Sequence, residues 1–113
     1  MGMYHSTYFA YGVHVDVSPY AEAERLEEEM PQHKGQIPDV GYLMAGAYDQ
    51  DQLFLTTACT EVDLGKWEHV TPQSHTAEQL ATWNRQLSDA VDLLGYGDRA
   101  VSAPGWLCVP DLS

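Results

Sequence analysis

Basic residues are scarce in this chain. Five of its 113 residues are Lys or Arg, against 17 Asp and Glu, so the formal net charge at pH 7 is -12. This charge would repel nucleic acid and anionic lipid, since each phosphate meets a like charge instead of a partner. We therefore expect no nucleic-acid or membrane partner. A basic protein or a cation fits the charge better, and the plain alternative is that the charge only keeps the protein in solution.

Long apolar runs are missing as well. No stretch approaches the 18 or so apolar residues of a membrane helix, and no basic stretch followed by an apolar one marks a secretory signal. The cytoplasm is therefore the expected compartment. The two cysteines, Cys59 and Cys108, lack the CxxC spacing of metal and redox sites, and their apolar neighbours predict buried free thiols.

Catalytic and nucleotide-binding signatures are absent from the sequence. It contains no G-x-S-x-G, G-x-x-x-x-G-K-[ST], G-x-G-x-x-G or H-E-x-x-H motif. Gly95 and Gly97 follow an expected helix, where a C-cap glycine is ordinary. We predict that the protein is not an enzyme, that it has no catalytic residues and that it needs no cofactor.

Two pairs of residues have part of a metal-site pattern. His14 and Asp16 lie two apart on an expected strand, so they point to one side and could bind a metal or orient a proton. No third ligand follows at a recognisable spacing, which favours a structural histidine near the strand end. Asp49 and Asp51 resemble the start of a calcium loop, but the glycine and the distal glutamate are missing. We expect no metal.

The first half of the chain carries strand and helix patterns in turn. Residues 4–17 alternate with a period of two and are rich in β-branched and aromatic side chains, which predicts a strand. Ser18 and Pro19 supply the N-cap and first turn of a helix that ends before Pro31. Its predicted buried side carries Ala23, Leu26 and Met30.

Two β-rich runs and a second helix follow. Residues 40–48 and 53–62 are joined by a short polar segment, which predicts an antiparallel hairpin. Thr76 and Gln79 form a capping box, and Gly95 marks the end of that helix. The apolar helix face consists of Leu80, Trp83, Leu87, Val91 and Leu94. Residues 106–109 form a last short apolar strand.

The resulting order, β-α-β-β-α-β, is that of the ferredoxin-like superfold, an α+β architecture. We predict one domain over residues 1–113, with a four-stranded antiparallel sheet and both helices on one face. The other face of the first strand would then carry Tyr8, Ala10, Gly12 and His14. This face is too apolar to stay in water, so we expect a second copy to cover it in a homodimer.

The first expected helix is strongly acidic. Its five glutamates, Glu22, Glu24, Glu27, Glu28 and Glu29, are offset only by Arg25. The first two complement the helix dipole, whereas the later three lie near its unfavourable C-terminal end. The glutamates form either a solvated face or a docking surface.

Three stretches together resemble a known group of proteins. They are residues 8–15 (YFAYGVHV), 81–87 (ATWNRQL) and 104–113 (PGWLCVPDLS). They resemble small acidic proteins of unassigned function from actinobacterial phages and prophages. The resemblance covers about half of the chain and includes no catalytic motif, so it implies no functional residues. It implies a setting in the cytoplasm of an infected or lysogenic bacterium.

The leading hypothesis is a non-enzymatic phage or prophage accessory protein that binds a host or phage protein. A sharper version is mimicry of DNA, with carboxylates occupying a basic groove. The expected contact residues are Glu24, Glu27, Glu28, Tyr8, His14, Tyr42 and Tyr48. The alternative is a small enzyme or ligand-binding protein, with a pocket on the open sheet face of a dimer lined by the four aromatic residues of that set.

Overall fold

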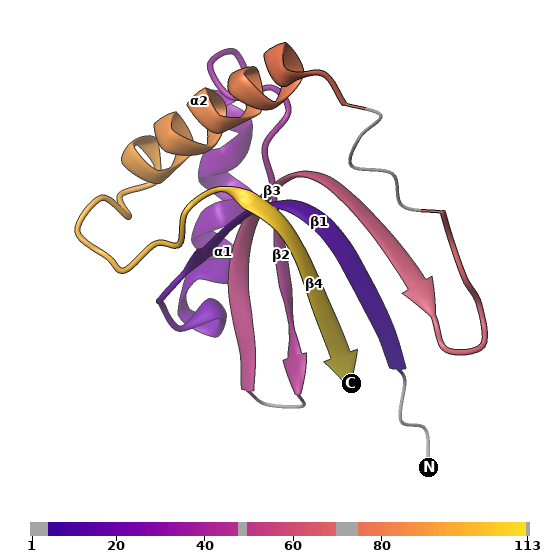
Figure 1. Cartoon of the computed structure of the whole chain (residues 1–113). Helices are drawn as coiled ribbons and strands as arrows, with labels where there is room; N and C mark the ends of the chain where they lie inside the picture. The colour runs from indigo at the N-terminus through magenta and orange to yellow at the C-terminus, as the bar shows by residue number, and fades with distance from the viewer. Residues whose placement is uncertain (1–4, 48–49, 70–74, 113) are drawn as a thin grey trace.

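The computed structural model describes residues 5–47, 50–69 and 75–112. Its strands are β1 His5–Val15, β2 Gly41–Ala47, β3 Gln50–Asp63 and β4 Gly105–Leu112. The helices are α1 Pro19–Glu29, a 3-10 helix η1 Met30–His33 and α2 Ala77–Leu93 (Figure 1). The predicted α+β class and the order β-α-β-β-α-β are confirmed. Of the helices in these ranges, none is long and apolar enough to cross a membrane.

The four strands form one curved sheet in the order β2-β3-β1-β4. Strand β1 pairs antiparallel with both β3 and β4, and β2 pairs antiparallel with β3, so the predicted antiparallel sheet is confirmed. The outer strands β2 and β4 meet in a parallel bridge between Ala47 and Leu112. This contact closes the sheet into a small barrel, which the sequence did not predict.

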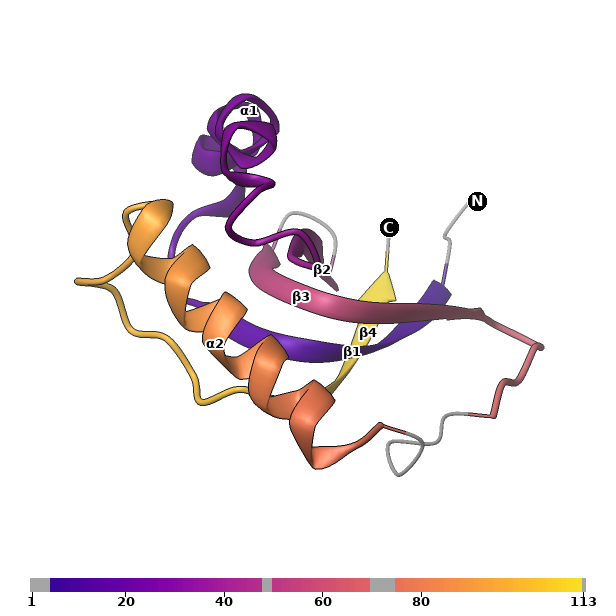
Figure 2. The same cartoon turned by 90° about the horizontal axis from the view of Figure 1, so that it is seen from above.

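Both helices pack against the same side of β1 and β3 (Figure 2). The buried helix residues pack against every second residue of the two strands, because successive strand side chains point to opposite faces of the sheet. Leu26 on α1 and Leu87 on α2 are fully buried at this junction. The strand residues of this core are Tyr11, Val13, Val15, Leu53 and Leu55. The main core therefore lies between the helices and one end of the sheet.

The helix ends follow the signals in the sequence. The Thr76 hydroxyl accepts a hydrogen bond from the Gln79 backbone N–H at 3.0 Å and caps α2. Gly95, with φ of 84°, adopts the left-handed conformation just beyond that helix. Ser18 precedes α1 but makes no side-chain cap bond to any described residue, so the start of α1 depends on Pro19 at its first position.

The sheet face opposite the helices is not open, contrary to the sequence-based expectation. Ala10 and Ala45 are 0% and 1% exposed, and with Phe54 and Val109 they belong to the buried interior of the curved sheet. The chain itself buries the apolar side chains that were the reason to expect a second copy here. The homodimer stays a prediction, without that reason.

A bulge in β3 at Thr57, opposite Tyr11 and Gly12, accompanies this curvature. The pairing of β1 with β3 shifts register between Tyr11 and Gly12. A Cβ atom on Gly12 would lie 2.1 Å from the backbone carbonyl oxygen of Leu55, so no other residue fits without moving the backbone. Gly12 is therefore required by the close approach of the two strands.

Two strands are longer than the sequence predicted. β3 begins at Gln50, so Asp51 lies in the strand and not in a turn. Tyr48 and Asp49 fall outside the described residues. β4 continues through Pro110 to Leu112. Proline lacks a backbone N–H, but it is tolerated in an outer strand, where one edge needs no donor.

Both cysteines are exposed, not buried as expected. Cys59 pairs with Ala10 and Cys108 with Phe9, and these successive residues of β1 face opposite sides of the sheet. Cys59 lies on β3 beyond Thr56. In this part of β3, β1 is the one described strand that pairs with it. Cys59 therefore lies in a part of β3 that β2 does not cover.

Candidate functional site

Helix α1 divides its five glutamates into two groups. Arg25 donates hydrogen bonds to Glu22 and, at 2.9 Å, to Glu29, which lie three residues before it and four after it. The Tyr96 hydroxyl donates a further bond to Glu22 at 2.8 Å. Hydrogen bonding from Arg25, with a smaller contribution from Tyr96, lowers the pKa of Glu22. These two carboxylates are therefore held within the protein.

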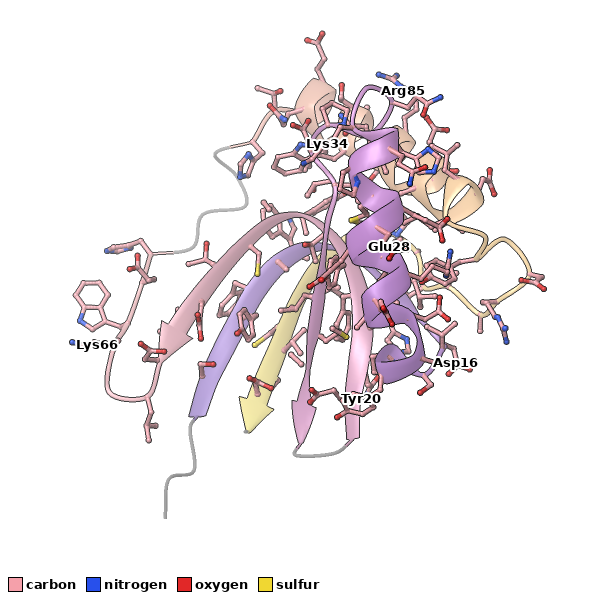
Figure 3. All side chains as sticks on the ribbon, turned by 180° about the vertical axis from the view of Figure 1, so that it is seen from behind. Asp16, Tyr20, Glu28, Lys34, Lys66 and Arg85 are labelled. Carbon is pink, nitrogen blue, oxygen red and sulfur yellow. The ribbon has the colours of Figure 1, made fainter. Side chains whose placement is uncertain are left out.

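The other three glutamates, Glu24, Glu27 and Glu28, are exposed and form no ion pair in the described part of the chain. Positions four apart are neighbours on a helix surface, so Glu24 and Glu28 lie side by side with Glu27 next to them. Figure 3 views α1 from the side on which Glu28 lies. We call this group the acidic ridge, defined as Glu24, Glu27 and Glu28.

Tyr42 on β2 lies beside the acidic ridge. Its hydroxyl donates a hydrogen bond of 3.4 Å to Glu27. Burial, and then the charge of Glu27, raise the pKa of Tyr42. The structure thus brings together two of the predicted contact residues, from β2 and α1.

Tyr8 and His14 lie far apart on β1. Six residues of strand separate them by roughly 20 Å. The Tyr8 hydroxyl donates to Glu61 at 3.3 Å, and burial, followed by Glu61, raises the pKa of Tyr8. The His14 ring packs against Phe54 with centroids 5.3 Å apart.

The predicted aromatic pocket does not form from these residues. Tyr42 packs against the main core on the helix side, whereas Tyr8 packs against the interior cluster on the opposite side. Tyr48, the fourth member, lies outside the described residues. Within residues 5–47, 50–69 and 75–112, no three His, Cys, Asp or Glu side chains are arranged to hold a metal ion.

A cavity of about 550 Å³ lies where β1 begins and β3 and β4 end. This end of the sheet points away from the two helices (Figure 1). We call the cavity the barrel mouth; it is lined by Ser6, Thr7, Gly46, Val62, Asp63, Leu64, Gly65, Lys66, Pro110 and Asp111. Sequence reasoning did not identify it.

The polar residues of the barrel mouth come from three adjacent strands. Ser6 on β1 pairs with Asp63 of β3 and with Asp111 of β4. The three side chains therefore point to the same face of the sheet. Asp111 Oδ1 accepts the Gly46 backbone N–H at 3.0 Å and ties β4 to β2 where the barrel closes. Ser6 is 5% exposed, and its Oγ has no hydrogen-bond partner among the residues that the structure describes.

The sequence carried one usable signal for this site. The period-two pattern places Ser6 and Tyr8 on one face of β1. Asp111 was missed because the predicted last strand stopped before Pro110, and Asp63 because it lay one residue past the predicted third strand.

The comparisons with known proteins give no family for the chain. It matches no protein-family model, and no curated protein and no solved structure is significantly similar to it.

Proposed function

We propose that the chain is a non-enzymatic accessory protein that binds a basic protein partner through the acidic ridge. The observation that supports this proposal is the division of α1: Arg25 holds Glu22 and Glu29, while the ridge carboxylates have no cation within the described part of the chain. Like charges four apart destabilise a helix, and negative charge near its C-terminal end adds to that cost. A partner's Lys or Arg side chains would offset both.

The interior of the sheet favours this function over the alternative. An enzyme or ligand-binding protein with a pocket on the sheet face would need space where Ala45, Phe54 and Val109 are packed. The Glu27–Tyr42 contact adds an amphipathic aromatic residue beside the ridge, and tyrosine is common at protein interfaces. We also propose that the domain is a closed variant of the ferredoxin-like superfold, with β1 and β3 central and the outer strands in contact.

A sharper form of the proposal is that the ridge occupies a basic groove that otherwise binds nucleic acid. Partner binding would then weaken steeply with salt, as phosphate binding does. The resemblance to phage and prophage proteins suggests a host or phage protein in the bacterial cytoplasm as the partner. In this form, duplex DNA and the protein compete for the same partner.

The test is affinity capture from actinobacterial lysate with three baits. They are the unchanged chain, a ridge variant Glu24→Lys, Glu27→Lys, Glu28→Lys, and an α2 variant Glu78→Lys, Asp89→Lys, Asp92→Lys. All six substituted residues are exposed, so both variants change the net charge equally. Circular dichroism checks that each variant keeps its helices.

We expect a partner that the unchanged chain and the α2 variant capture and the ridge variant does not. Its association rate should fall as salt shortens the Debye length from about 10 Å at 0.1 M to about 3 Å at 1 M. Equal capture by the ridge variant would refute the proposal. Equal loss with both variants would show that only total charge matters.

A further inference from the structure

The loop after β3 exposes two large apolar side chains. Leu64 is 79% exposed and Trp67 is 76% exposed, and both lie within residues 64–69. We call residues 64–69 the mouth loop. Large apolar side chains are usually buried, and neighbouring ones that remain in water mark interaction surfaces. The mouth loop therefore has the composition of a contact surface.

The mouth loop is ordered by its own contacts. The Lys66 backbone N–H donates to the Asp63 carbonyl oxygen at 2.9 Å, which closes a turn. Gly65 has φ of 86°, the left-handed conformation that the third position of such a turn favours. The Trp67 ring contacts the His69 ring edge to face, with centroids 5.4 Å apart. Trp67 is therefore held in an exposed position, which lowers the entropic cost of a contact made through it.

The barrel mouth lies directly beside this loop. Residues 64–66 form part of its wall, and Thr7, Val62 and Pro110 form another part. These three residues are partly or fully exposed, so a side chain that enters the mouth can contact them. The cavity of about 550 Å³ has room for a large aromatic side chain. A projection and a hollow therefore lie side by side at one end of the molecule.

The projection and the hollow carry opposite charges. Lys66 is exposed and forms no ion pair in the described part of the chain. Figure 3 shows it on the loop beyond the end of β3, at the edge of the molecule. Asp111 lines the mouth and is partly exposed. Burial, and then the charge of Asp111, raise the pKa of Asp51, so a cation near Asp111 would be favourable.

We propose that the mouth loop of one copy of the chain enters the barrel mouth of a second copy, and that the exchange is reciprocal. A two-fold axis brings the same patch of both copies together, so the projection of each copy faces the hollow of the other. Trp67 then packs against Val62 and Pro110 of the second copy. Lys66 lies beside Asp111 of the second copy.

The occupant is a second copy because one chain supplies both halves of the contact, the apolar projection with its cation and the hollow with its carboxylate. This surface differs from the sheet face on which the sequence predicted the homodimer. It is also separate from the acidic ridge on α1, so neither proposal depends on the other.

Two effects limit the strength of this dimer. One loop in one cavity buries a small area on each copy, and interfaces of that size are weak. Each copy also carries a formal net charge of -12, and the resulting repulsion falls as salt shortens the Debye length. We therefore expect a Kd of about 100 µM in about 0.3 M salt.

The test is sedimentation velocity of the full chain between about 10 µM and about 1 mM in this salt. A reductant is present because both cysteines are exposed. We expect the weight-average mass to rise from near one chain to most of the way to two. Amide shifts on dilution locate the interface: Val62, Asp111 and the Trp67 indole should shift, and Glu28 on α1 should not. A monomer at about 1 mM, or shifts confined to other surfaces, would overturn the proposal.

Substitutions of Trp67 test the apolar part of the contact. Trp67→Ala removes the projecting indole, and it should weaken the dimer at least about tenfold, because tryptophans at the centre of an interface often dominate binding. Trp67→Phe keeps an aromatic ring and should weaken it less. Because Trp67 is exposed, neither change should disturb the fold, which circular dichroism checks. Equal dimerisation of Trp67→Ala and the unchanged chain would overturn the proposal.

A matched pair of lysine substitutions tests the charge part. Lys66→Glu and Lys34→Glu change the net charge equally, and both lysines are exposed on loops. Lys66→Glu should weaken the dimer about tenfold more than Lys34→Glu, because it replaces two ion pairs of the two-fold contact with two repulsions. Equal weakening by the two substitutions would also overturn the proposal.

Discussion

The two ends of β1 lie in contrasting surroundings. Around Val13 and Val15 the strand is buried, with the helices on one side and the interior of the sheet on the other. Around Ser6 the same strand borders a cavity flanked by Asp63 and Asp111. The helix-covered end uses apolar side chains to hold the fold, and the mouth end has polar side chains beside a cavity. Stability and recognition should therefore respond to different substitutions.

Leu87→Ala should lower the free energy of unfolding most, because Leu87 lies at the helix-covered end of the sheet. Leu87 is fully buried between α2 and the sheet. We expect the free energy of unfolding to fall by about 3 kcal/mol, from lost burial and the cavity left behind. Urea denaturation followed by circular dichroism measures it. A loss below about 1 kcal/mol would mean that this end does not dominate stability.

Gly12→Ala should come next, because Gly12 lies between the two ends. The new methyl group would meet the Leu55 carbonyl oxygen, so the backbone must shift. We expect the free energy of unfolding to fall by about 2 kcal/mol. Gly35→Ala is the matched control, since nothing lies within 4 Å of its Cβ position. Equal losses in the two variants, measured in urea, would show that the close approach of β1 and β3 is not limiting.

Low pH should reduce the stability of the protein through Glu22, one of the two glutamates that Arg25 binds on α1. The lowered pKa of Glu22 stabilises the fold above the ordinary glutamate value of about 4.3. This stabilisation is lost as the pH falls through the lowered value. Glu22→Gln should remove that part of the pH dependence. Glu28→Gln leaves the Arg25 cluster intact and should retain it; thermal unfolding between about pH 3 and pH 7 compares the two.

Ser6→Ala should change the free energy of unfolding least, and should raise it where the other substitutions lower it. The hydroxyl has no partner among the described residues, so its removal relieves an unsatisfied group. We expect the free energy of unfolding to rise by about 0.5 kcal/mol. Thr76→Ala, which deletes the hydroxyl that caps α2, should instead cost about 1 kcal/mol. A similar loss in Ser6→Ala would mean that Ser6 has a stabilising partner in the folded protein.

Local signals account for the parts of the fold that the sequence predicted. The period-two pattern of β1, the Thr76 cap and Gly95 each act within a few residues, so each can be identified without knowing the rest of the structure. The closure of the barrel is not local. It depends on a close approach at Gly12 and on β4 continuing past Pro110, both set by strands distant in sequence.

The candidate sites follow the same division. The acidic ridge lies within one helix, so the sequence alone could group its residues, although the pairing of Arg25 with Glu22 and Glu29 was not foreseen. The face on which Tyr42 lies was left open, because it depends on the hairpin register. The barrel mouth joins the start of β1 to the ends of β3 and β4, and two of its carboxylates lay beyond the predicted strands. Gln86, a buried polar residue bonded to Asp39, was missed for a similar reason.

The positions of Cys59 and Cys108 on opposite faces of the sheet have a consequence for handling the protein. The two thiols cannot reach each other within one chain, since the sheet lies between them. Each molecule therefore has two thiols that can be oxidised, one on each face of the sheet. Burial, and then Glu61, raise the pKa of Cys59, so less of it is thiolate and its oxidation is slower. Air oxidation would consequently join molecules through their disulfides into open chains that lengthen with time, and a reductant would return them to single polypeptides.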